Sequence, residues 1–217
     1  YPPLYMAMLW FVGAVRNLLG IAYGSTAHVV LIKLIPILAD AAMACLVYLF
    51  AKKRVNARAA MLLGAVCALN PAAIVDSAAW GQLDAVFTVF LALGAVLLSE
   101  RDYVWALPMF TLSMLMKPQA LLFAPLGLLA QVASLAWRPK KRKILSAVYG
   151  LAASLALLLL AGFVFHENGV GPVRWLYELY GSTMGSYPHL TINALNLYEL
   201  LGLNWASLSD NAALTVF

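Results

Sequence analysis

The stretch HVVLIKLIPILADAAMACLVYLFA, from His28 to Ala51, decides the class of this protein. Its formally charged side chains are Lys33 and Asp40, and the rest is almost entirely apolar. A hydrocarbon core roughly 30 Å thick is crossed by about 20 apolar helical residues. Since the stretch has that length and that character, it predicts a transmembrane helix.

The rest of the chain has the same character. Hydrophobic residues make up 64% of it and charged residues 11%, and the mean hydropathy is +0.87, far from the average soluble domain. We expect an all-α, polytopic transmembrane helix bundle of about six spans in a single domain, with the bundle occupying 28–165. The predicted spans are 28–51, 57–70, 84–99, 103–116, 118–137 and 144–165.

The positions of the basic residues predict the orientation. Nine of the 14 basic residues lie in two short connectors, KKRVNAR (52–58) and RPKKRK (138–143). By the positive-inside rule both connectors face the cytoplasm. The predicted outer loops agree, because 70–83 has no Lys or Arg and 166–210 has only Arg174. Such runs set membrane topology, so no nucleic-acid partner is expected.

The two ends of the chain do not fit the alternation of spans. We expect 1–24 to form an interfacial helix on the outer face, since counting it as a span would break the alternation. The alternative is a hairpin that dips into the bilayer. Residues 166–210 are predicted to be an outer loop with a second interfacial helix, and 211–217 the start of a further span. The chain is thus expected to be truncated at both ends.

The stretch NPAAIVDSAAWGQLDAVF (70–87) places carboxylates beside a helix break. Pro71 disfavours helical geometry at Asn70, so we expect the helix to stop there and an outer loop to follow. If the segment is helical, Asp76, Trp80 and Asp84 share about one face. Together with Gln82 they predict a shallow sugar pocket, in which the indole stacks on a pyranose and the polar groups bind hydroxyls. The alternative is an interfacial Trp and a helix cap at Asp84.

Other polar side chains interrupt apolar runs. In MLMKPQALLFAP (114–125), Lys117 precedes Pro118 at a broken helix and is a candidate phosphate ligand, or it snorkels to the interface. Arg16 has the same two interpretations. Lys33 and Asp40 are predicted to join helices. His189 and Asn193 lie in an expected ordered loop, and the three scattered histidines indicate no metal site.

Four segments occur in an order that resembles the GT-C fold membrane glycosyltransferases. They are YPPLY (1–5), NPAAIVDSAAWGQLDA (70–85), KPQALLFAP (117–125) and YPHLTINALNLYELLG (187–202). The chain resembles in particular the bacterial GPI-mannosyltransferase-like integral membrane proteins. It is more distantly similar to the dolichyl-phosphate-glucose-dependent glucosyltransferases.

The resemblance implies roles for individual residues. Pro2 and Pro3 match the family's paired prolines, while Trp80 and Gly81 depart from the distant relatives. The implied catalytic carboxylates are Asp84 and Asp76, with the main base expected upstream of Tyr1, so that the chain alone would be inactive. The implied substrate-binding residues are Trp80, Gln82, Lys117, Gln119, Arg16, His189 and Asn193.

The reaction implied by the resemblance is transfer of a hexose, such as mannose, from a polyprenyl-phosphate-linked donor with inversion. It would occur on the outer face of the bacterial cytoplasmic membrane, with a glycan, lipid or protein as acceptor. No cofactor is expected, and a requirement for a divalent metal is left open. Two other functions stay open as well. One is a transporter or channel that uses Asp40, Asp84 and Lys117, and the other is a non-catalytic assembly subunit.

Overall fold

The computed structural model describes residues 1–137, 141–185, 188–192 and 196–214. It is 78% helix, and no strand occurs in these ranges, so the predicted all-α class is confirmed. The helices in chain order are α1 (Pro3–Leu18), α2 (Thr26–Lys52), α3 (Ala57–Ala68), α4 (Pro71–Ile74), the π-helical turn η1 (Val75–Trp80), α5 (Asp84–Ser99), α6 (Tyr103–Met116), the 3-10 turn η2 (Pro118–Leu122), α7 (Ala124–Trp137), α8 (Lys141–Phe165), α9 (Pro172–Gly185), α10 (Leu197–Leu200) and the 3-10 turn η3 (Ser209–Leu214).

Each of the six apolar stretches predicted as a span is helical over most of its length. Within the described residues, three helical segments are long and apolar enough to cross a membrane: Thr26–Lys52, Ala57–Trp80 and Lys141–Phe165. The other three apolar helices are shorter, at Asp84–Ser99, Tyr103–Met116 and Pro118–Ala133. The protein therefore has the helices of a membrane protein, while the number of spans remains a prediction.

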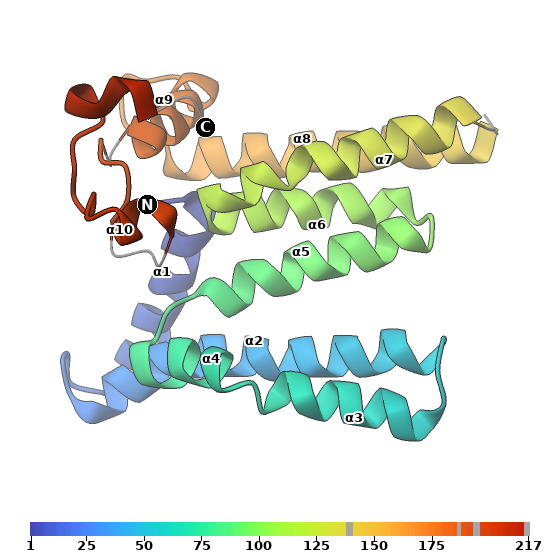
Figure 1. Ribbon diagram of the computed structural model, residues 1–217, viewed down its shortest axis with the longest axis horizontal. Helices are drawn as coiled ribbons and strands as arrows, with labels where there is room; N and C mark the ends of the chain where they lie inside the picture. The colour runs from blue at the N-terminus through green and yellow to red at the C-terminus, as the bar shows by residue number, and fades with distance from the viewer. Residues whose placement is uncertain (138–140, 186–187, 193–195, 215–217) are drawn as a thin grey trace.

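The long helices run side by side, and α1 runs across one end of them (Figure 1). We call this the crossed end; α4, α9 and α10 lie there too. The connectors that follow α2 and α5 lie at the opposite end, where α8 also begins, and we call this the basic end (Figure 1). An ion pair between Lys53 and Glu100, 2.6 Å long, ties these two connectors together. The first basic run (52–58) and the described part of the second, 141–143, are thus at one end, as the predicted alternation requires.

Close contacts between small and polar groups hold the central helices together. The hydroxyl of Ser113 in α6, fully buried, donates a hydrogen bond of 2.9 Å to the carbonyl of Phe87 in α5. Gly150 of α8 lies so close to α6 that a Cβ there would come within 2.3 Å of the Tyr103 carbonyl oxygen. Small residues of this kind let membrane helices approach each other closely.

The predicted break at Asn70 is confirmed, because α3 ends at Ala68, but the prediction that an outer loop follows is wrong, because α4 and η1 continue the helical path to Trp80. Asn70 does interrupt the helix: its backbone is extended, with ψ at 114°. Its side chain, however, accepts a hydrogen bond from the amide of Ala72, and Pro71 takes the first helical position, so a new helix starts at once. The outer loop predicted over 70–83 shrinks to Gly81, Gln82 and Leu83.

Helical segments also fill the ends of the chain. The α1 helix covers most of the segment predicted to be interfacial and contacts α2, α6 and α8. The α9 helix lies within the predicted outer loop and packs against α8. The predicted further span at 211–217 begins in η3, and its last residues, 215–217, lie outside the described ranges.

Candidate functional site

A cavity of about 920 Å³ opens at the crossed end of the helices. It lies where the start of α5, the turn between α6 and η2, and the two terminal segments meet. Five residues predicted from the sequence to act at a site lie around this one space, although they come from three separate segments. The lining residues are Tyr1, Pro2, Tyr5, Gln82, Leu83, Asp84, Met116, Lys117, Pro118, Gln119, Leu121, Leu122, Thr183, His189 and Ile192.

Asp84 and Lys117 form an ion pair in the wall of this cavity. Asp84 is the first residue of α5, where a negative charge is favoured by the helix dipole. Lys117 follows the last residue of α6 in extended backbone, with φ at −149°, because Pro118 disfavours helical geometry at the preceding residue. The carboxylate is 41% exposed and the lysine side chain 30%, so both groups are open to a ligand.

The face of Phe87 adds a third contact to the lysine. The ammonium nitrogen of Lys117 lies 5.6 Å from the centre of the Phe87 ring, one turn along α5 from Asp84. A cation in this position is attracted to the negative face of the ring. Lys117 therefore contacts both a carboxylate and an aromatic face, and it lines the cavity.

The polar backbone of the 80–84 turn brings Gln82 to the same wall. Gly81 has a φ of +83°, a conformation that L side chains rarely adopt, and it ends the π-helical turn η1. The amides of Gly81 and Gln82 both donate to the carbonyl of Asp76, at 2.9 and 3.0 Å. These two hydrogen bonds fix the direction in which the chain leaves η1 for Asp84.

The C-terminal part of the chain supplies a further part of the lining. His189 forms a bridge to Ser207, and its ring lies 5.5 Å from that of Trp205 in an edge-on arrangement. Tyr180 anchors α9 nearby, since its hydroxyl donates 2.8 Å to the carbonyl of Met114. Burial raises the pKa of Tyr180 well above its usual range. Tyr5, in the lining, also has a raised pKa, mainly from burial and secondly from Tyr1.

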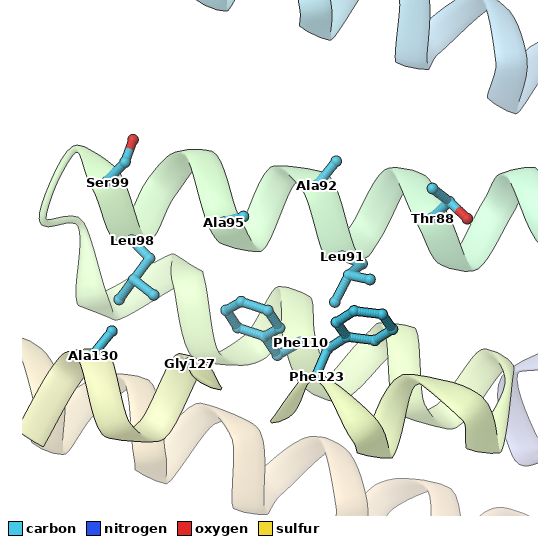
Figure 2. A pocket seen from close by; sticks show the side chains of 10 residues that line it. All are labelled: Thr88, Leu91, Ala92, Ala95, Leu98, Ser99, Phe110, Phe123, Gly127 and Ala130. Atoms are coloured by element: carbon cyan, nitrogen blue, oxygen red, sulfur yellow. The ribbon is translucent and has the colours of Figure 1, made fainter. Parts of the chain in front are cut away.

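A second, apolar space lies between α5, α6 and α7. This groove, of about 690 Å³, begins at Thr88, whose hydroxyl donates 2.6 Å to the carbonyl of Asp84 one turn earlier. Figure 2 shows Leu91 pointing from α5 toward Phe110 and Phe123, and Leu98 pointing toward Ala130. Its full lining is Thr88, Leu91, Ala92, Ala95, Leu98, Ser99, Phe110, Phe123, Gly127 and Ala130. The groove therefore adjoins a charged cavity and runs toward the basic end.

Three predicted site residues do not line the cavity, and a fourth cannot be placed. Asp76 and Trp80 were expected to share a helical face with Asp84, but η1 is wound as a π-helix and Gly81 ends it, so the α-helical spacing does not apply. Trp80 is 73% exposed. Arg16 instead lies over the ring of Tyr23, 5.5 Å from its centre. Asn193 lies outside the described residues.

Other lining residues were not predicted. Tyr5 and Thr183 bring hydroxyl groups, and Met116 and Ile192 bring apolar contacts. Tyr5 belongs to the YPPLY motif (1–5), and this motif could have identified it as a site residue. No sequence motif marks Thr183. Among the residues that the structure describes, no three His, Cys, Asp or Glu side chains group together to hold a metal ion.

The geometry can bind a negatively charged ligand at Lys117, accept a proton at Asp84 and hydrogen-bond hydroxyl groups through Gln82, Gln119 and His189. The beginning of an apolar groove lies within one helical turn of the ion pair. Comparison of the chain with protein-family models, with curated proteins and with solved structures finds no match.

Proposed function

We propose that this chain belongs to a membrane glycosyltransferase that takes a hexose, such as mannose, from a polyprenyl-phosphate-linked donor. The observation that carries the proposal is the Asp84–Lys117 pair in a polar cavity that adjoins an apolar groove. A donor of this class has three parts that need different surroundings: a charged phosphate, a hydroxyl-rich sugar and a long apolar chain. The cavity and groove offer a suitable surface for each.

Lys117 is the proposed phosphate ligand. A positive charge beside the phosphate offsets the negative charge that grows on it as it leaves. The lysine is already paired with Asp84, so a bound phosphate would compete with the carboxylate for the ammonium group. Binding of the donor would thereby free Asp84 for a second role.

Among the described residues, Asp84 is the proposed catalytic base. An acceptor hydroxyl oxygen attacks the anomeric carbon, the bond from that carbon to the phosphate oxygen breaks, and the polyprenyl phosphate leaves with the electron pair. The hydroxyl proton passes to the Asp84 carboxylate. Attack from the side opposite the phosphate inverts the anomeric centre. A carboxylate upstream of Tyr1 is the alternative base that the family resemblance implies.

The sugar would lie among the amide and imidazole groups of the cavity. Gln82, Gln119 and His189 all line the cavity that holds the ion pair. The Nδ1 atom of His189 is buried without a hydrogen-bond partner among the described residues. Since an unpaired buried polar atom is costly, a hydroxyl group of a ligand would satisfy it.

The membrane setting of the proposal follows from the predicted orientation. With the basic end in the cytoplasm, the cavity at the crossed end faces the opposite side of a bacterial cytoplasmic membrane. We place α1 and α9 at that interface, in a GT-C-like arrangement of about six spans. The acceptor is a glycan, lipid or protein that reaches the same side.

A transporter is the less favoured function. It would need Asp40, Asp84 and Lys117 to line one path, but Asp40 is absent from the lining of the cavity that holds the other two. No observation on the described residues favours it over the transferase.

The test is binding of donor by the chain in lipid nanodiscs, followed by native mass spectrometry. Polyprenyl-phosphate mannose is compared with polyprenyl phosphate and with the uncharged polyprenol. We expect Lys117→Met to lower affinity for both phosphates about tenfold and to leave polyprenol binding unchanged. The matched control is Lys53→Met, which removes an ion-paired lysine at the basic end. Equal binding of all three ligands by the wild type and Lys117→Met would refute the proposal.

A further inference from the structure

Lys33 makes a contact that the proposed reaction does not explain. It lies seven residues after the start of α2, about 10 Å along the helix axis. Its ammonium nitrogen donates a hydrogen bond of 2.7 Å to the carbonyl of Ala79 in η1. The lysine thus joins α2 to the end of another helical segment, as predicted from the sequence.

The carbonyl that Lys33 binds is one of the last in η1. The final carbonyls of a helix have no partner within it, and a lysine at this position both satisfies one of them and complements the negative end of the helix. The bond therefore holds the end of the π-helical turn that leads directly to the cavity wall.

The aliphatic part of Lys33 makes a second contact, with Gly81. A Cβ built on Gly81 would lie 3.3 Å from Cγ and 3.4 Å from Cε of Lys33. The stem of the lysine is thus packed against the one residue of the turn that has a positive φ. The ammonium group of Lys33 therefore binds the chain just before Trp80, and its stem packs against Gly81 just after Trp80.

We propose that Lys33 is a positioning residue for the cavity. It fixes η1 and Gly81, whose geometry sets where Gln82 and Asp84 enter the wall. The amides of Gly81 and Gln82 that bond the Asp76 carbonyl are the groups through which this restraint acts. The chemical consequence rests on the proposed function, but the restraint itself is a property of the turn and is measurable without any reaction.

The first measurement is hydrogen exchange of the Gly81 and Gln82 amides in nanodiscs. Lys33→Met keeps the length of the stem and loses the donor, and we expect about tenfold faster exchange of these two amides. Lys33→Arg keeps a donor and should restore slow exchange. Lys53→Met, in the exposed ion pair at the basic end, should leave both amides unchanged. Unchanged exchange in Lys33→Met would overturn the proposal.

A second variant approaches the same contact from the other side. Gly81→Ala adds a Cβ that presses on the lysine stem in a strained backbone conformation, and we expect faster exchange at Gln82 with Lys33 intact. Slow exchange at Gln82 in this variant would contradict the packing argument. It also keeps the proposal testable if Lys33→Met fails to fold.

Donor binding separates this proposal from the proposed function. We expect Lys33→Met to keep its affinity for polyprenyl phosphate within about twofold, because Lys117 is unchanged, and to bind polyprenyl-phosphate mannose more weakly than the wild type does, because Gln82 is displaced. If the exchange result holds but the wild type binds no polyprenyl phosphate, Lys33 still positions the turn and the glycosyltransferase assignment fails. If donor binds but Lys33→Met keeps the wild-type affinity for polyprenyl-phosphate mannose, the positioning role fails alone.

Discussion

The ammonium group of Lys117 contacts the carboxylate of Asp84 across 33 positions of sequence. The two residues stand at the open ends of the antiparallel hairpin made by α5 and α6, whose tip is the connector carrying Glu100. The pair therefore closes the hairpin at the crossed end, while Lys53 and Glu100 fasten its tip to the neighbouring connector.

Removal of either member of the Asp84–Lys117 pair should lower stability modestly. We expect Asp84→Asn and Lys117→Met each to cost about 0.5–1 kcal/mol, because partly exposed ion pairs are screened by solvent. The double variant should cost less than the sum of the two, as expected for direct contact. Chemical unfolding in detergent provides the measurement. Full additivity would show that the two groups do not interact in solution.

The orientation of the chain can be tested with single cysteines. In a background with Cys45 and Cys67 replaced by Ala, Asn56→Cys should react with a membrane-impermeant maleimide only after the cells are opened. Glu167→Cys, at the crossed end, should react in intact spheroplasts. The opposite pattern would place the cavity in the cytoplasm and would contradict the proposed donor side.

The contact of α6 with α8 predicts a large effect at one glycine. In Gly150→Ala, the added Cβ would lie 2.3 Å from a backbone oxygen, so the helices must move apart, and we expect a loss of about 2 kcal/mol or more. Gly13→Ala in α1 is the matched control, because nothing lies within 4 Å of its Cβ. Its higher helix propensity should raise stability by about 0.5–1 kcal/mol. Thermal unfolding of both variants provides the comparison.

The Ser113 hydroxyl predicts a measurable link between α5 and α6. Ser113→Ala should cost about 1 kcal/mol, because the variant loses a buried hydrogen bond between helices. Ser99→Ala should be nearly neutral, since Ser99 bonds the carbonyl of Val96 in its own helix and is exposed. Equal effects of the two substitutions on the free energy of unfolding would argue against this link.

Tyr180 predicts a loss of stability at alkaline pH. Burial raises the folded-state pKa of Tyr180, so its contribution to the free energy of unfolding is complete below the unfolded pKa of about 10. The contribution is lost as the pH rises from there toward the folded value. Tyr180→Phe should therefore lose about 1 kcal/mol at pH 8 from the missing hydrogen bond and decline less steeply above pH 10. Tyr177→Phe, at an 80% exposed position, should follow the wild-type curve.

Hydropathy and charge predicted the helices well, because both depend on local composition. Helical segments form over the six apolar stretches, and the basic residues that the structure describes in 52–58 and 141–143 lie at one end. Gln82, Asp84, Lys117 and Gln119 reach one cavity because all four sit beside helix ends marked by Gly81 or Pro118. Their positions at a common end followed from the alternation of helices, while their roles remain predictions.

What the sequence could not predict depends on backbone geometry inside one segment. The Asn70–Pro71 pair stops a helix in general, but here the Asn70 side chain caps a new one. A π-helical turn then changes which side chains share a face, so Trp80 points to the exterior while Gln82 reaches the cavity. Neither effect changes the spacing of the apolar residues, so the sequence pattern does not reveal it. The hydrogen bond from Lys33 to the Ala79 carbonyl in η1 could not be predicted for the same reason.

The shortness of α5 and α6 has a consequence for the surrounding lipid. With 14 residues, α6 rises about 21 Å, whereas α2, with 27, rises about 40 Å. In the proposed membrane setting, the two helices that meet at the ion pair are therefore shorter than a hydrocarbon core of roughly 30 Å, which α2 is long enough to cross. Hydrophobic mismatch of this kind is relieved by a locally thinner bilayer. The thickness of the host membrane, set by its acyl chains, then determines how deeply the ion pair lies beneath the headgroups.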